Sequence, residues 1–447
     1  MLPARGRLGS FTLVVAALAA CAEAKLAQDG DAGGDGDGGG DVDAPIVEPR
    51  CGDGNVDPGE ACDDGNQVDT DACTSACQGW RYRVPVTFTA AAAATGVPVL
   101  IVLDGASFAY DHAAADGSDL RADADDDPAS GFGLPLWLER WTPTGASYLW
   151  VRVPAVSAGA NTIWLYYGWS GDALPSTSDF AATFPDTLRT TGNLSLGGTV
   201  SHDAVVIEAG HTVTVAPGAP LVITAPYVRI DGAIAADHAG YAGGAGPAPG
   251  GTSTTAGAGG GGHGGAGGRG GLDGGDSPGA GGLASGDLSS ESIAMGSGGG
   301  TTDSSPVAGR GGGAVQVDGR RVVLAGTIGA RGEVGGSSGR CSGGGAGGGV
   351  LVRASSIELT GAIAVDGGAG GSGTSTANDG GGGGGGGRIK LLHGGALVAT
   401  GTTTVTGGAG GLYGDAGNGQ PGSPGTFYTG TSSSLAPLPS IGAEETP

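Results

Sequence analysis

The sequence is poor in basic residues and in aromatic ones. Lys and Arg together number 20, against 44 Asp plus Glu, and the formal net charge is −24. So large a negative excess argues against nucleic-acid binding and against electrostatic attraction to anionic lipid. It is compatible with a hydrated extracellular surface and with divalent cations.

Signatures of catalysis are also missing. The six histidines are scattered and form no pair with the spacing of metal ligands. No Gly-x-Ser-x-Gly elbow occurs in a strand-to-helix context, and the glycine run 381–387 is not closed by the Lys-Ser/Thr of a phosphate-binding loop. We therefore expect a protein that is not an enzyme and needs no cofactor, calcium at one site excepted.

A long hydrophobic run is absent as well. The apolar stretch 11–20 follows Arg5 and Arg7, is too short to span a bilayer and predicts a signal peptide over 1–20. It ends in Leu-Ala-Ala-Cys21, which resembles the lipobox of bacterial lipoproteins. The resemblance implies lipidation of Cys21 and, because Ala22 follows, delivery to the outer membrane. We expect the protein to lie on the cell surface there. Cleavage after residue 24 is the alternative and would release a secreted protein.

The acidic, glycine-rich residues 21–50 cannot bury a core and predict a disordered tether. Four cysteines then fall within 27 residues: Cys51, Cys62, Cys73 and Cys77. Behind an export signal they predict two disulfides, whose connectivity the spacing leaves open. A zinc site is the alternative, which the compartment and the uneven spacing disfavour.

Within residues 51–78, the blocks CGDG, GE-x-C, DDGN and C-x3-C resemble the cysteine-rich repeat of myxobacterial secreted proteins, which implies no catalytic role. Asp53, Asn55 and Asp57 are spaced like the first ligands of a calcium loop. Pro58 stands where an EF-hand loop has its glycine, and no closing glutamate follows. Calcium binding and a solvated acidic turn are therefore the two alternatives.

All six tryptophans lie between residues 80 and 169, among short alternating runs separated by turn residues. This pattern predicts an antiparallel β-sandwich over 79–184. The blocks DGSDLR (116–121), LPLWLE (134–139), WVRVP (150–154) and YYG (166–168) resemble, in order, those of a secreted bacterial domain family of unknown function. The resemblance implies a jelly-roll-like or lectin-like fold with no established ligand.

The candidate ligand-binding residues of this domain are Asp116, Asp119, Arg121, Trp137 and Glu139. Carboxylates that orient hydroxyl groups, beside a tryptophan face, suit a carbohydrate or calcium site. The alternative is a turn with a buried Arg–carboxylate pair, in which the tryptophans fill the core. Two carboxylates of a glycosidase are a third reading, which nothing here selects.

A glycine-rich repeat organises residues 185–411. Three times an apolar residue is followed by others seven and then four positions on: Ile223, Ile230, Ile234; Val317, Leu324, Ile328; and Val352, Leu359, Ile363. A fourth pass, Leu391, Val398, Thr402, keeps only the spacing. Stacked coils of a parallel β-solenoid would bury such residues.

The glycine tracts between the passes predict excursions from one corner of the solenoid, either disordered or packed as extended polyproline-II-like chains. The alternative to a solenoid is that the whole glycine-rich half of the chain is disordered. Cys341, within Gly-Arg-Cys-Ser-Gly, is expected to be exposed and passive, and a free thiol or an intermolecular disulfide are the alternatives. Residues 412–447 are expected to cap the solenoid and then fray.

These observations predict an all-β, non-enzymatic lipoprotein of the cell envelope with a structural, adhesive or recognition role. Its expected partners are the membrane, through the lipid anchor, and a polysaccharide or an envelope protein, but not nucleic acid. The alternatives are a carbohydrate-binding module on the same anchor and, least favoured, a polysaccharide hydrolase.

Overall fold

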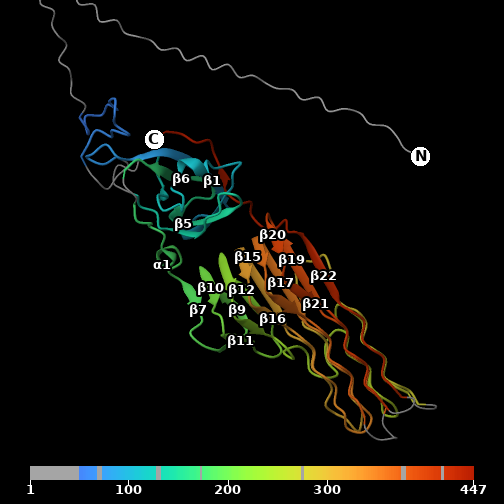
Figure 1. The fold of residues 1–447 in the computed structure, drawn as a ribbon. Coiled ribbons are helices and arrows are strands. Elements are labelled where there is room, and N and C mark those ends of the chain that lie inside the picture. Colours follow the sequence, from blue (N-terminus) through green and yellow to red (C-terminus); the bar gives the residue numbers. More distant parts are fainter. Residues whose placement is uncertain are drawn as a thin grey trace, which may run out of the picture. The chain divides into compact units, whose positions relative to one another are not determined.

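The computed structural model describes residues 50–67, 73–126, 132–171, 174–272, 276–373, 379–413 and 417–446 (Figure 1). These residues belong to one compact unit, residues 49–447. The predicted signal peptide, Cys21 and nearly all of the tether lie outside the described residues. Within the described part of the chain, no helix is long and apolar enough to cross a membrane.

Two antiparallel sheets form the predicted β-sandwich, with strand orders β23-β1-β6-β3 and β2-β5-β4. Alternating residues such as Val84, Ile101 and Leu149 are buried between them. The strands are β1 (Trp80–Ala90), β2 (Ala94–Leu103), β3 (Arg121–Asp123), β4 (Leu136–Arg140), β5 (Ser147–Val156), β6 (Gly159–Trp169) and β23 (Ser440–Ile441), and the two short helices nearby are η1 (Tyr110–His112) and α1 (Phe180–Thr183).

The carboxyl end of the chain belongs to this sandwich. Val86 of β1 pairs with Ile441, and Glu444 accepts a hydrogen bond from the Tyr167 hydroxyl at 2.5 Å. The expectation that this end frays beyond the solenoid is therefore wrong for the described residues up to 446. Their β-pairing supplies the backbone with partners that a frayed tail would lack.

Between β6 and β23 the chain forms the predicted parallel β-solenoid, which has three faces. The first face stacks β9, β12, β15, β17, β19 and β22; the second β7, β10, β13, β15, β17 and β20; and the third β8, β11, β14, β16, β18 and β21. β15 and β17 each span two faces. The bounds are β7 (Thr187–Arg189), β8 (Leu194–Leu196), β9 (Gly198–Ser201), β10 (Ala204–Ile207), β11 (Thr212–Val215), β12 (Leu221–Thr224), β13 (Tyr227–Ile230), β14 (Ala233–Ala235), β15 (Ala314–Leu324), β16 (Thr327–Gly329), β17 (Gly349–Leu359), β18 (Ala362–Ala364), β19 (Arg388–His393), β20 (Leu397–Ala399), β21 (Thr402–Thr404) and β22 (Thr426–Thr431).

The seven-then-four spacing arises because its three positions sit on the three faces and point into one core. Ile223 pairs with Val317, and Val317 with Val352, so that equivalent residues stack along the solenoid. The fourth pass departs from this spacing. Leu359 pairs with Ala399 rather than with Val398, and the Val398 side chain points outward and is 46% exposed.

In each of the first three passes a glycine follows the middle apolar position by two residues, and it lies at the corner between the second and third faces. A Cβ on Gly361 would lie 1.9 Å from the carbonyl oxygen of Gly326, and one on Gly326 would lie 1.9 Å from that of Gly232. Real Cβ atoms do not approach so closely. The corner is therefore a ladder of close backbone contacts, which only glycine permits.

The glycine tracts, residues 236–313, 330–348, 365–387 and 405–425, leave the corner between the third and first faces and return to it (Figure 1). Their described backbones bond to one another with a period of three. In residues 341–348 the N–H groups of Cys341, Gly344 and Gly347 donate to one neighbour (379–385), those of Ser342, Gly345 and Gly348 to a second (330–336), and those of Gly343 and Ala346 to a third (297–300). Three residues per turn is the repeat of polyproline II, so the packed alternative is confirmed for these residues.

Segments with three neighbours carry only glycine or a few small residues, such as Cys341, Ser342 and Ala346 in residues 341–348. In residues 380–387, whose N–H groups serve three neighbours, every residue is glycine. In outer segments each third residue faces away from the bundle and carries a side chain, as Asp366, Ala369 and Ser372 do. The Gly-Gly-x pattern therefore distinguishes outer from inner segments.

Cys341 lies inside this bundle, contrary to the expectation of an exposed residue. It is fully buried and forms no disulfide with any other described cysteine. Burial raises the pKa of its thiol. The prediction was wrong because the glycine-rich sequence around Cys341 forms the interior of the bundle rather than a solvent-exposed loop.

Gly384→Ala should destabilise the folded chain by about 2 kcal/mol, because its Cβ would lie 2.0 Å from the Gly345 carbonyl oxygen, with backbone on every side. The matched control is Ala409→Ser, which adds one atom at an exposed, outward position. Urea unfolding of both variants measures the difference. Equal stability would show that the bundle is not packed as described.

The bundle also contains a buried histidine whose titration opposes folding. His263 is 2% exposed, and its Nδ1 lies 3.0 Å from the Gly347 carbonyl oxygen. Burial, and less strongly the charges of Arg388 and Lys390, lower its pKa to about 4. Between this value and the ordinary value of about 6.5 the unfolded chain binds the proton and the folded chain does not.

Stability should therefore fall by about 3 kcal/mol as the pH is lowered from about 6.5 to about 4, and should not depend on this group above 6.5. Denaturant midpoints across this range measure the loss. His263→Gln, which does not titrate, is the comparison. If the variant and the parent lose stability in parallel, His263 is not the responsible group.

Candidate functional site

The residues predicted to form one ligand site lie in two separate places. Asp116, Asp119 and Arg121 belong to the loop before β3 and to β3 itself, whereas Trp137 and Glu139 lie on β4, which faces the solenoid. The structure therefore does not join the five into one site.

Asp119 is 4% exposed, and its carboxylate links the loop before β3 to the end of β6 through backbone hydrogen bonds. Its Oδ2 accepts from the N–H groups of Gly168 (2.7 Å) and Trp169 (3.2 Å), and Oδ1 accepts from Ala114 (3.0 Å). Asp116 caps its own turn by accepting from the N–H of Ser118 at 3.0 Å. Both carboxylates are thus engaged in local structure, as the second reading of this block predicted.

Arg121 is 8% exposed and bonds to carbonyl oxygens rather than to a carboxylate. Nη1 donates to Ser118 and Leu120, and Nη2 to Pro175. Its guanidinium also lies 5.6 Å from the ring centre of Trp80. The expected Arg–carboxylate pair is therefore absent at this position, because three carbonyls supply the acceptors.

A buried ion pair does exist, at Glu139, and its partner comes from the solenoid. Arg321 of β15 donates through Nε to Glu139 Oε1, while Trp150 Nε1 donates to Oε2 at 3.1 Å. The two charged side chains are 2% and 6% exposed. Both oxygens of Glu139 are occupied, which suits a structural link better than a free acid or base.

Arg321 extends the link to β17. Its Nη2 donates to Glu358 at 2.8 Å, and Arg140 of β4 bonds the same carboxylate at 2.7 Å. Burial alone would raise the pKa of Glu358, but the hydrogen bonds from Arg140 and Arg321 outweigh it and leave the pKa lowered. The Arg321 guanidinium also lies 3.6 Å from the ring centre of Tyr148.

An aromatic cluster completes this contact between sandwich and solenoid. Trp137 packs edge-on against Phe180 (4.9 Å) and Tyr227 of β13 (5.1 Å), and Trp150 packs against Phe184 (5.1 Å). Leu100, Val206 and Val323 bury further apolar surface there. Trp137 therefore serves the core between the two parts, as the alternative reading allowed.

One cleft opens beside this cluster. The junction cleft has a volume of about 280 Å³ and is lined by Trp137, Glu139, Phe180, Arg189, Val206, Glu208, Tyr227, Arg229 and Asp231. Its rim carries two ion pairs, Arg189–Glu208 and Arg229–Asp231. Burial, with the charge of Glu139, raises the pKa of Tyr227 to about 12, so this hydroxyl stays protonated at neutral pH. Aromatic walls with a charged rim can stack on a sugar ring and bond its hydroxyls.

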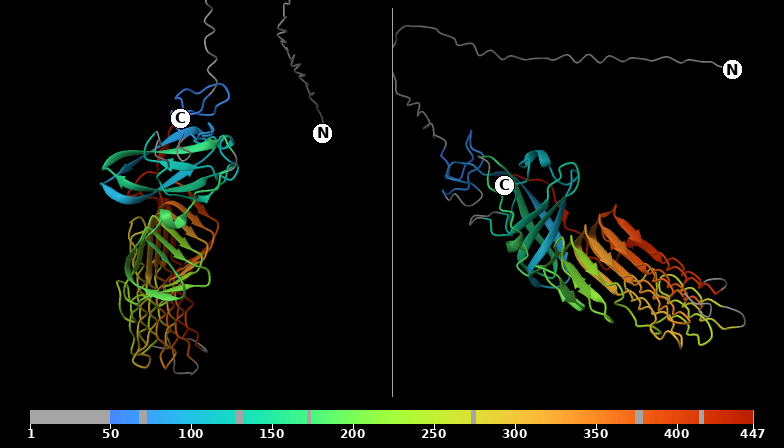
Figure 2. Two further views of the ribbon diagram at one scale, coloured as in Figure 1. Left: turned by 90° about the vertical axis from the view of Figure 1, so that its left-hand side faces the viewer. Right: turned by 60° about the horizontal axis from the view of Figure 1, so that its bottom comes forward.

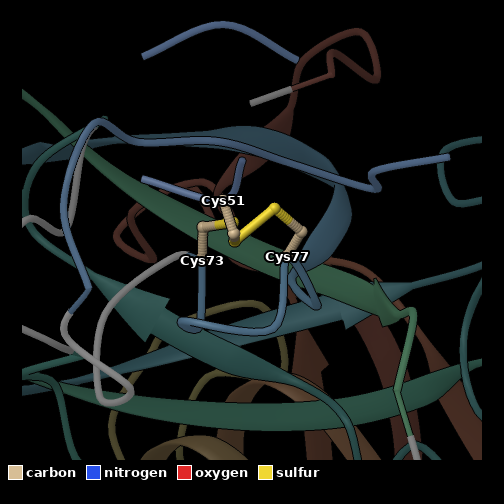
Figure 3. A group of neighbouring side chains, drawn as sticks. All are labelled: Cys51, Cys73 and Cys77. Carbon is tan, nitrogen blue, oxygen red and sulfur yellow. A yellow bond between two sulfur atoms is a disulfide. The ribbon is translucent and has the colours of Figure 1, made fainter. Parts of the chain in front are cut away.

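The cysteine module is closed by two nested disulfides, Cys51–Cys77 and Cys62–Cys73. Figure 3 shows Cys73 beside the Cys51–Cys77 bond. The four cysteines are thus paired, as predicted in preference to a zinc site.

A carboxylate that the sequence reading did not single out organises this module. Asp63 accepts four backbone N–H groups, from Gly52, Asp53, Gly54 and Gly65, at 2.8–3.1 Å. The sequence signal was the Gly-Asp-Gly and Asp-Gly turns on either side, whose N–H groups need an acceptor.

Of the two alternatives for Asp53, Asn55 and Asp57, calcium binding gains no support from the geometry of these side chains. Asp53 Oδ1 accepts from the backbone and side-chain nitrogens of Asn55 at 2.9 and 3.2 Å. In the described part of the chain, the groups of three converging Cys, His or acidic ligands are Cys51–Cys73–Cys77 and Glu60–Asp63–Cys77. Each contains disulfide sulfur, and neither contains Asp53 or Asp57.

Comparison with known proteins adds one finding. Residues 116–186 match the family described as a domain of unknown function, DUF2341. The match contains all four sequence blocks that suggested such a domain. No curated protein and no solved structure matches the chain.

Arg321→Met should lower the stability of the folded chain by about 3–5 kcal/mol, because it leaves the buried Glu139 carboxylate without its cation. Arg331→Met is the control: Arg331 is half exposed and pairs with Asp237 on the surface, where less than about 1 kcal/mol is expected. Thermal and urea unfolding give both values. A small loss for Arg321→Met would mean that the junction is not held by this pair.

Proposed function

We propose that this protein is a non-enzymatic lipoprotein of the cell envelope, anchored to the outer membrane through Cys21 and exposed at the cell surface, with a structural or adhesive role. The observation that carries the proposal is the junction between sandwich and solenoid. It joins a buried aromatic core to a buried ion network, Glu139–Arg321–Glu358. The two parts are therefore suited to act as one stiff body.

The connectivity supports the same role. The chain leaves the sandwich after β6, builds the solenoid and returns to pair β23 with β1. The chain segments that enter and leave the solenoid are thus both attached to the sandwich, through β6 and β23. Such a body can hold a binding or structural surface at a defined distance from its attachment, and the backbone-bonded glycine bundle adds length without a large apolar core.

A carbohydrate-binding module is the second candidate, and the junction cleft favours it. Its volume of about 280 Å³ suits one sugar unit, and Trp137, Phe180 and Tyr227 supply apolar walls. Polysaccharide binding that is lost in Arg189→Ala, a half-exposed rim residue, would support this candidate. Arg331→Ala is the matched control. A hydrolase has no comparable support, because both oxygens of Glu139 already accept hydrogen bonds.

Cys21→Ser should move the protein from the membrane fraction to the soluble fraction and abolish incorporation of a labelled fatty acid. Ser10→Ala, in the preceding segment, is a control that keeps the cysteine. Protease added to intact cells should digest the wild-type protein only if it lies at the cell surface. Unchanged fractionation of Cys21→Ser would contradict the lipid anchor.

A further inference from the structure

The two ends of the solenoid are open. At one end β7, β8 and β9 each pair on one side only, and at the other end β20, β21 and β22 do the same. Residues in such strands present unpaired N–H and C=O groups that can extend a sheet. Solenoids usually cover both ends with polar capping structure. Among the described residues, no further strand covers either end.

Apolar core residues reach the surface at these ends. Phe427 of β22 pairs with Ile389 and continues the core column of Leu221, Val315 and Val350. Ile389 is fully buried, yet Phe427 is 45% exposed because no described strand stacks on it. At the other end Leu188, Leu194 and Val200 are likewise only partly buried against the same core.

The edges also lack the charges that keep exposed strands apart. β20, β21 and β22 contain no charged residue, and β7, β8 and β9 contain only Arg189. This is notable in a chain with a formal charge of −24. Charged residues on edge strands usually prevent edge-to-edge pairing, so these edges lack the charge repulsion that would oppose pairing with another strand.

The two open ends match each other in strand direction and in the side chains that would meet. All strands of the solenoid are parallel, so a strand added beyond β22 in the same register has the polarity of β9. In that register Phe427 would face Gly198, where a Cβ would meet nothing within 4 Å, and Leu397 would face Leu188. A large side chain thus meets an open position, and apolar residues meet apolar residues.

The first coils leave room for such a neighbour. The connections from β8 to β9 and from β11 to β12 are short and carry no glycine tract, unlike those of the later coils. In the left view of Figure 2 the first coils, in green, face the viewer, and the sandwich lies above them.

We propose that copies of this chain stack end to end, with β20, β21 and β22 of one copy pairing with β7, β8 and β9 of the next. The occupant of each open end is the opposite end of a second copy. Such contacts are heterologous and do not close, so the product is a linear filament rather than a dimer. This inference rests on the solenoid and holds whether or not the chain is lipidated.

The test uses the chain with Cys21→Ser, so that lipid plays no part. Sedimentation velocity and negative-stain electron microscopy over a concentration series should show linear oligomers that grow with concentration. Val398→Lys places a charge on the β20 edge and should weaken association by about tenfold or more. Val334→Lys, at a valine that is 58% exposed on the outer face of a glycine tract, should leave association unchanged.

A mixing experiment separates end-to-end stacking from other association. Thr199→Lys blocks the β9 edge, and Val398→Lys blocks the β20 edge at the opposite end. Each variant alone should form few oligomers, and their mixture should form dimers that stop at two copies, because each copy retains one intact end. Monomers at every concentration, or oligomers insensitive to both edge variants, would overturn the proposal. A wild-type population that stops at dimers would overturn head-to-tail stacking.

Discussion

Hydrogen bonds between glycine backbones are the constraint on which the carboxyl-terminal half of this structure depends. The inner segments of the bundle turn their N–H groups toward three neighbours in rotation, and at their glycine positions these neighbours lie too close for a Cβ atom. Glycine has the largest conformational entropy to lose on ordering. The bundle offsets that loss by satisfying the backbone donors of its inner segments, as in residues 380–387, and by stacking on the apolar core of the solenoid, which fixes where each tract begins and ends.

The junction carries this order into the sandwich. On the outer face of the solenoid, Tyr227 packs against Trp137 of the sandwich, and Arg321 forms an ion pair with Glu139 of the sandwich. A buried ion pair contributes little net stability, since desolvation opposes it, but it penalises any arrangement in which the two parts separate or shift. The aromatic packing supplies the attraction, and the charged network fixes the orientation.

Sequence reasoning predicted the elements whose signals are local and periodic. The repeated spacing of Ile223, Val317 and Val352 predicted the solenoid, because a parallel stack repeats its inward-facing residues at equivalent positions of each coil. The partner of Glu139 could not be found this way: Arg321 lies 182 residues away, and nothing near Glu139 marks it. The pairing of Ser440–Ile441 with β1 was hidden for the same reason, since two residues show no alternation. The inner and outer glycine segments, by contrast, could have been told apart from the Gly-Gly-x period.

The return of the last strand to the sandwich makes this a fold that is completed late. Thr87 and Ser440 meet across 353 residues, and the intervening chain must first be compacted by the solenoid before that contact costs little loop entropy. While the chain is being synthesised, β1 therefore has an unoccupied edge until Ser440 and Ile441 emerge. A chain interrupted anywhere in the solenoid loses a strand of the sandwich as well, so damage to one part exposes the other to proteolysis.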